Sequence, residues 1–244
     1  IVASMKFRMI IWLLAVGSAW SLGAAEAAKL SLKSGDRVVM TYNAGHVPSP
    51  IPDQDYYGRS GFIHPVFTPE GRVVTEAFPA DHPHQHGLMF AWTTATYDGR
   101  KINFWDQKRR EGIIRHARTI HADDHRIVVG LEHVSITNTP AATALTETWE
   151  ITRVANKAMN VFDLVSTQNC ATDKPVTMRK YHYGAMAVRG AANWMKEGAS
   201  MKTDEGKDRK AGNHSRPRWV VLSGNVDGAP CGIVAMSHPD NFRS

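Results

Sequence analysis

Apolar and polar residues alternate along most of this chain, and many of the apolar positions hold β-branched side chains. Alternation places one set of side chains on one face of a strand, so it is typical of half-buried strands. Gly, Pro, Asn or Asp bounds each alternating segment, as expected for strands joined by turns. The pattern predicts strands at Arg37–Tyr42, Phe62–Phe67, Arg72–Ala77, Leu88–Tyr97, Ile113–Ile120, Arg126–Thr137, Ala144–Arg153, Asn160–Gln168, Val176–Tyr183, Arg218–Ser223 and Gly232–Ser237.

Helical periodicity is missing from the sequence, apart from a single expected helical turn at Asn193–Glu197. Asp98-Gly99 predicts a hairpin turn. Many strands without helices predict an all-β fold, built from two packed sheets or a barrel. The polar segment Ala191–Pro217 interrupts the alternation, and we interpret it as the lid or rim of a binding cleft or as a loose insertion.

The two ends of the chain carry their own signals. Met5 is the expected start, and the apolar run Met9–Val16 is much shorter than the ~20 residues of a spanning helix. Residues 5–27 therefore predict a signal peptide, followed by a single β-sandwich domain at 28–244. This domain is expected in the periplasm or outside the cell, without stable membrane insertion after cleavage. The turn-like His238–Ser244 predicts that the sandwich is truncated at its C-terminus.

The distribution of charge along the chain argues against one class of partner, nucleic acid. The formal net charge is +6, from 29 basic and 23 acidic residues that are dispersed along the chain. Because a nucleic-acid-binding protein usually shows a basic stripe, we expect no nucleic-acid partner.

The chain has two cysteines, and export permits a disulfide between Cys170 and Cys231. The alternative is a pair of buried free thiols.

The segment Asp81–Gly87 holds three of the twelve histidines. As proton-transfer groups, His82 and His84 would act on a bound ligand. As metal ligands, His82, His84 and His86 would hold a divalent ion such as Zn, Cu or Fe. On a regular strand these three imidazoles would share one face, but Pro83 disfavours a regular strand. The third alternative is a turn in which the imidazoles only bond to the backbone.

Two further segments combine imidazoles with aromatic rings or arginine. His182 lies between Tyr181 and Tyr183, an arrangement that suits a sugar's apolar face and its hydroxyl groups. The alternative is that the two tyrosines belong to the core and that the nitrogens of the histidine are hydrogen-bonded inside the protein. His214 and Arg216 could hold an anionic sugar or an oxyanion, or could pair with acidic residues of their own loop.

Arg59, His64 and Trp92 complete the predicted substrate-binding set. We expect Glu147 to face water, because it is one of two glutamates in a strand that is expected to be exposed; facing inward, it could act as a general base. Trp92, Trp105 and Trp149 could each be a core residue or a sugar platform, and the core is the expected place. The sequence has no Gly-rich phosphate loop and no Gly-x-Ser-x-Gly elbow, which argues against dinucleotide enzymes, kinases and common serine hydrolases.

Five ordered motifs carry a resemblance to a known family: Phe62–Pro69, Asp81–Leu88, Tyr181–Gly184, Gly212–Trp219 and His238–Asn241. In this order they resemble a secreted bacterial family of unknown function that is labelled methane oxygenase PmoA-like. The resemblance runs from about Tyr42 to the end of the chain.

A more distant resemblance links the chain to the galactose mutarotase-like group. The layout of Leu145–Thr152, Val161–Ser166, Asp173–Thr177 and Lys180–Gly184 is similar to that group. The resemblance implies a two-sheet β-supersandwich with a sugar cleft on a concave sheet. It also implies that His182 is the acid-like histidine, and that His82, His84 or His86 corresponds to the first histidine of the group. The group's glutamate base lies beyond the end of this chain.

Together, these observations predict an exported carbohydrate-active enzyme of epimerase, lyase or hydrolase type. His82, His84 and His182 would transfer protons on a small carbohydrate or acidic sugar. One alternative is a histidine-ligated, metal-dependent oxygenase or lyase, and another is a non-catalytic glycan-binding module. The prediction requires side chains near positions 84, 182 and 214 to meet in space.

Overall fold

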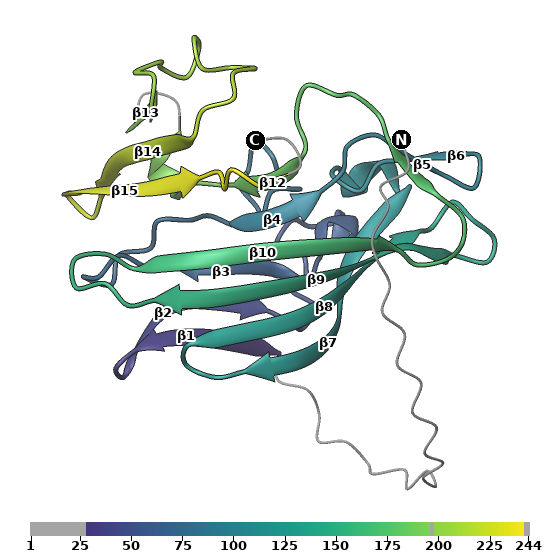
Figure 1. Cartoon of the computed structure of the whole chain (residues 1–244), viewed down its shortest axis with the longest axis horizontal. Helices are drawn as coiled ribbons and strands as arrows, with labels where there is room; N and C mark the ends of the chain where they lie inside the picture. The colour runs from purple at the N-terminus through teal and green to yellow at the C-terminus, as the bar shows by residue number, and fades with distance from the viewer. Residues whose placement is uncertain (1–27, 196–197, 242–244) are drawn as a thin grey trace, which may run out of the picture.

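A computed structural model of the chain describes residues 28–195 and 198–241, and these form an all-β fold (Figure 1). The predicted signal peptide at residues 5–27 lies outside the described residues. The helical segments within them are short 3-10 turns, η1 Asp55–Tyr57, η2 Gln107–Arg109 and η3 Ala192–Trp194. No helix in this described part is long and apolar enough to cross a membrane.

The strands form two large and two small antiparallel sheets. The first large sheet has the order β1-β2-β3-β4-β12, with bounds Lys29–Ser34, Arg37–Asn43, Phe62–Val66, Leu88–Ala91 and Ala185–Val188. The second has the order β10-β9-β8-β7, with bounds Val161–Cys170, Ala142–Val154, Arg126–Ser135 and Gly112–Ala122. The small sheets are β11-β5-β6, at Val176–Met178, Ala95–Tyr97 and Arg100–Ile102, and β13-β14-β15, at Ala199–Thr203, Trp219–Val226 and Ala229–Met236.

The main core lies between the two large sheets, which face each other in Figure 1. Tyr42 of β2 and Trp149 of β9 are fully buried, and their ring centroids lie 6.1 Å apart. A second, smaller core joins Val74, Ala191, Trp194 and Val226 beneath the β13–β15 sheet. The all-β fold that the alternating pattern predicts is confirmed, and its two large packed sheets, with two further small sheets, are consistent with a β-sandwich.

Several predicted strands have different bounds in the structure. Arg72–Ala77 forms isolated bridges, and Leu88–Tyr97 divides into β4 and β5. The division occurs because β4 pairs with β12 while β5 pairs with β6 and β11, so the chain passes from one sheet to another. The predicted strand Val176–Tyr183 ends at Met178, and the predicted loop Ala191–Pro217 contains η3 and β13.

Both cysteines are free thiols. Cys170 is exposed at the end of β10, and Cys231 is half-buried in β15. The structure therefore has neither the disulfide nor the pair of fully buried thiols that the sequence left as alternatives.

Candidate functional site

The histidine run lies in the loop that enters β4, and it turns rather than extends. The amide of His82 donates to the carbonyl of Pro79 at 3.1 Å, and the amide of Gln85 donates to the carbonyl of His82 at 2.9 Å. Gly87 ends the turn with a φ of 50°, and a Cβ at this position would lie 2.0 Å from the carbonyl oxygen of Ile63. The tight approach of β3 therefore requires a glycine here. Because the run turns, its imidazoles do not share one strand face.

Four loops bring aromatic and imidazole rings into one continuous series, which we name the aromatic–imidazole row. His82 and His84 come from the loop before β4, and Trp105 comes from the loop between β6 and β7. His182 and Tyr183 come from the loop between β11 and β12, and His214 comes from the loop between β13 and β14. The centroid distances along the row are 5.6 Å for His82–His84, 6.4 Å for His84–Trp105, 5.4 Å for Trp105–Tyr183, 4.6 Å for Tyr183–His182 and 6.4 Å for His182–His214. The row joins the three separated regions that the sequence analysis required to meet.

Two tyrosines form the open face of the row. The side chains of Tyr181 and Tyr183 are 45% and 48% exposed, and their rings lie 4.9 Å apart. Trp105, the ring next to Tyr183, is buried and supports it from within. Exposed aromatic rings of this size present an apolar face together with a polar tip. The row can therefore contact a ligand that combines apolar and hydroxyl-bearing surfaces.

A polar contact and a glycine hold the tyrosine loop in place. The hydroxyl of Thr93 donates to the backbone carbonyl of Tyr183 at 3.0 Å. Gly184 follows with a φ of 138°, in the region that favours glycine. The chain then enters β12, which pairs with β4. The loop is thus tied to the first large sheet immediately after Tyr183.

Burial sets the protonation of two members of the row. The pKa of His84 is lowered, mainly because burial disfavours the imidazolium, although the nearby Asp106 opposes this effect. The pKa of Tyr183 is raised by burial and by its hydrogen-bonded neighbour Tyr181. Near neutral pH, His84 is therefore a neutral imidazole that can accept a proton, and Tyr183 is a neutral phenol that can donate a hydrogen bond.

Three predicted substrate-binding residues make polar contacts inside the protein and take no part in the ring contacts of the row. Arg59 is buried, donates to the carbonyl of Phe90 at 3.3 Å, and has its pKa lowered by burial to about 10. His64 contacts the hydroxyl of Thr75 at 3.0 Å. Trp92 donates to the side-chain oxygen of Gln168 at 2.8 Å. The polar atoms of these three side chains are therefore engaged in hydrogen bonds within the protein. Arg216 is exposed, two residues after His214.

The expectation that Glu147 faces water is wrong. Its side chain is buried between the sheets and accepts hydrogen bonds from His133 at 2.7 Å, from Trp149 at 2.6 Å, and also from Ser166 and Gln168. Burial alone would raise the pKa of Glu147, but the hydrogen bonds, led by that from His133, outweigh burial and lower it. Glu147 is therefore a buried carboxylate that belongs to the interior.

His86 does not join the other two histidines of its run. It is fully buried, and Phe78 and Phe62 contact its ring at centroid distances of 4.5 Å and 5.2 Å. Within residues 28–195 and 198–241, no three His, Cys, Asp or Glu side chains are grouped in a way that could hold a metal ion. The alternative of a metal held by His82, His84 and His86 lacks the required convergence in this arrangement.

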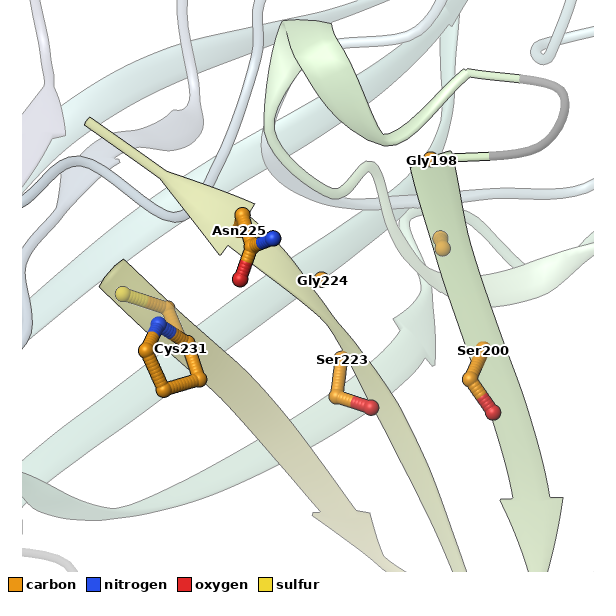
Figure 2. Close-up of a pocket in the computed structure, with 8 residues that line it drawn as sticks. Gly198, Ser200, Ser223, Gly224, Asn225 and Cys231 are labelled. Carbon is orange, nitrogen blue, oxygen red and sulfur yellow. The ribbon is translucent and has the colours of Figure 1, made fainter. Parts of the chain in front are cut away.

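A hollow of about 350 Å³ lies elsewhere, on the β13–β15 sheet (Figure 2). Ser200 and Ser223 lie directly opposite each other on neighbouring strands, with Asn225 and Cys231 close by. Among the residues that the structure describes, those lining the hollow carry no imidazole, carboxylate or guanidinium group. Because this hollow has little acid–base capacity, the aromatic–imidazole row is the stronger candidate site.

One family model matches a stretch of the chain that includes every residue of the site. A model described as a family of unknown function, DUF6807, matches residues 29–244. The chain belongs to this family. No curated protein and no solved structure matches the chain. Every member of the aromatic–imidazole row lies inside the DUF6807 match, so the row is part of the domain that defines membership.

For this member of DUF6807, sequence reasoning missed Arg189 and missed the linking role of Trp105. Trp105 was expected in the core, and it is buried there, but it also connects His84 to Tyr183. Arg189 was not singled out, although its guanidinium contacts Glu76, Asp81 and Gln85 in the loop that carries the histidines. The contacts of Arg189 could not be predicted from the neighbouring sequence, because its partners lie more than 100 positions away along the chain.

Proposed function

We propose that this protein binds a carbohydrate or sugar-derived ligand at the aromatic–imidazole row and acts on it by proton transfer. The observation that carries the proposal is the continuity of the row from His82 to His214. Packing alone seldom requires several exposed imidazoles and phenols from distant loops to lie against one another, whereas a hydroxyl-rich ligand uses both kinds of group.

The chemistry of the row suits an acid–base enzyme. His84 is held as a neutral imidazole and can accept a proton from a hydroxyl group or an acidic C–H. His82 is its neighbour in the row, and His182 lies further along, beyond Trp105 and Tyr183. Both supply further exposed donor and acceptor nitrogens. An epimerase, a lyase or a hydrolase would each use such a set.

An acidic sugar is the favoured class of ligand. His214 stands at one end of the row, and the exposed Arg216 follows it by two residues. In this proposal both would face the ligand's anionic part. Arg109 adds positive charge near Tyr183, and this charge opposes the rise in the pKa of that phenol. Carboxylate recognition by the rigid guanidinium fork is stronger than recognition of neutral hydroxyls.

The distant resemblance to the galactose mutarotase-like group supports the same proposal. The galactose mutarotase-like layout implies a β-supersandwich that acts on sugars, and it places His182 in an acid-like role. We further propose export to the periplasm or beyond the cell, based on the signal-peptide pattern at residues 5–27. Fold analogy raises the expectation of sugar chemistry, whereas the row supplies the chemical groups.

Calorimetry on the purified chain tests the proposal. A panel of neutral monosaccharides, uronic acids and aldonic acids is titrated into the protein, and products are followed by proton NMR. We expect at least one acidic sugar to bind, and we expect His84→Ala and His182→Ala to weaken binding or abolish conversion. His121→Ala is the matched control, because His121 is exposed on β7 outside the row.

The outcomes separate the remaining alternatives. Binding without conversion, weakened by the same variants, would replace the enzyme with a glycan-binding module. No binding by any sugar, or equal behaviour of His84→Ala, His182→Ala and His121→Ala, would overturn the carbohydrate proposal.

A further inference from the structure

Arg189 fastens the histidine-bearing loop to the first large sheet. Its guanidinium donates to Asp81 at 2.7 Å, to Gln85 at 3.1 Å and to Glu76 at 3.3 Å. The backbone amide of Arg189 also donates to the carbonyl of Gly87 at 2.7 Å. A single planar cation thus joins three acceptors on both sides of the turn, a task that suits arginine's fixed fork of donors.

One of these acceptors also holds a histidine of the row. Asp81 Oδ2 lies 2.7 Å from Nδ1 of His82. The hydrogen bonds that Asp81 receives from His82 and Arg189 outweigh the effect of burial and lower its pKa, so this side chain remains a carboxylate. Because a carboxylate only accepts hydrogen bonds, Nδ1 of a neutral His82 must carry the proton. The lone pair is then left on Nε2.

We propose that Arg189 and Asp81 are positioning residues that fix His82 in the Nδ1–H tautomer and make its Nε2 a proton acceptor of the site. The inference rests on the proposed function, and it assigns one acid–base role within it. In the step that follows, Nε2 takes a proton from a ligand O–H or C–H bond, and the bonding electron pair stays on the ligand atom. The imidazolium that forms is stabilised by the Asp81 carboxylate, which Arg189 keeps in place.

The chain offers a matched internal control with the opposite geometry. On β7, His121 contacts Asp123 through Nε2, at 2.8 Å, and not through Nδ1. The same reasoning assigns the Nε2–H tautomer to His121. Free neutral imidazole side chains favour Nε2–H in water, so the Nδ1–H form at His82 is the diagnostic state.

Nitrogen-15 NMR of the ligand-free full chain tests the assignment at a pH of about 8.5, roughly two units above the ordinary imidazole pKa. Long-range couplings from ring protons distinguish the two tautomers. We expect Nδ1–H at His82 and Nε2–H at His121 in the unaltered protein. Asp81→Ala should move His82 to the Nε2–H form, and Arg189→Ala should give a mixture. Arg189→Lys, a cation without the fork, should restore part of the Nδ1–H signal.

Each result supports or overturns the inference. Nε2–H at His82 in the unaltered protein, or an unchanged tautomer in Asp81→Ala, would overturn the role of Asp81. An unchanged tautomer in Arg189→Ala would overturn the role of Arg189. The dispersion of the backbone amide signals reports whether each variant retains its fold, because His121 would keep the Nε2–H form even in an unfolded chain. The measurement uses no sugar, so a failure of the carbohydrate proposal is seen separately, in calorimetry.

Discussion

His133 and Glu147 are hydrogen-bonded to each other inside the β-sandwich. Nε2 of His133 lies 2.7 Å from Oε2 of Glu147, and neither side chain is exposed. The two residues lie on the neighbouring strands β8 and β9, where Glu147 is opposite Leu131 and His133 is opposite Leu145. They are therefore diagonal neighbours on one face of the sheet, within reach of each other's side chains. Trp149, Ser166 and Gln168 occupy the remaining acceptor positions of the carboxylate.

Removing the charge of Glu147 tests how far this carboxylate stabilises the sandwich. Glu147→Gln keeps the shape but places an amide where several donors converge, so some buried donors lose their acceptor. We expect the free energy of unfolding to fall by about 2–4 kcal/mol, measured by urea denaturation. Glu150→Gln is the matched control, because Glu150 lies on the same strand with a side chain that is 45% exposed, and it pairs with Arg126. That control should cost less than about 1 kcal/mol. Equal losses would contradict the buried role of Glu147.

Buried His86 predicts a pH dependence of stability. Burial lowers its pKa well below the ordinary value, so the native imidazole stays neutral. As the pH falls below about 6.5, the unfolded chain takes up a proton at this position before the native protein does. The free energy of unfolding should therefore decrease from pH 7 towards pH 5, with a contribution from His86 of up to about 1.4 kcal/mol per pH unit.

Urea denaturation across this pH range, repeated with His86→Gln, isolates the contribution. The variant should show a shallower dependence on pH, whatever its stability at pH 7. His121→Gln removes an exposed imidazole and is the control. The slope lost in His86→Gln must exceed that lost in His121→Gln, and a smaller loss would contradict the assignment.

The division between β4 and β5 shows the limit of predicting this fold from sequence. Alternation predicts the existence of strands, because each large sheet has one face in the core. It does not specify which strand pairs with which, and Leu88–Tyr97 reads as one strand although its two halves join different sheets. The four residues of β12 alternate weakly, and they become a strand because β4 offers an edge for pairing.

The orientation of Glu147 could have been predicted from the sequence, although the prediction made here was wrong. Leu145, Trp149 and Ile151 share its parity on β9, and all three are buried. Parity with these apolar side chains is the signal that places Glu147 inward. No comparable signal joins His84 to Tyr183, since Trp105 connects them only after three loops have folded together.

The ring of Tyr183 is expected to contribute more to ligand binding than its hydroxyl group, if the carbohydrate proposal is correct. The ring is about half exposed and contacts Tyr181, His182 and Trp105. Tyr183→Ala should raise the Kd of a bound acidic sugar by roughly tenfold, or about 1.4 kcal/mol, whereas Tyr183→Phe should retain most of the affinity. Calorimetry measures both. Trp219→Ala, which removes an exposed ring on β14 outside the row, should leave the Kd unchanged. Equal weakening in all three variants would contradict a specific platform.

The hydroxyl of Thr93 should control the order of the tyrosine loop. Thr93 is buried and donates to the backbone carbonyl of Tyr183 at 3.0 Å. Thr93→Val keeps the shape of the side chain and removes this donor, so the carbonyl loses its partner. We expect the free energy of unfolding to fall by about 1 kcal/mol. Amide exchange should become faster in peptides that cover the loop between β11 and β12.

Hydrogen-exchange mass spectrometry checks the Thr93 prediction region by region. The core strands β8 and β9 should keep their protection in Thr93→Val, because the lost bond ties the loop and not the sandwich. Thr148→Val, a half-buried threonine of β9, is the matched control for replacing a hydroxyl with a methyl group. Faster exchange spread evenly over the chain would indicate global destabilisation and would contradict a local tether. Faster exchange confined to the loop would link the hydroxyl of Thr93 directly to the placement of Tyr183.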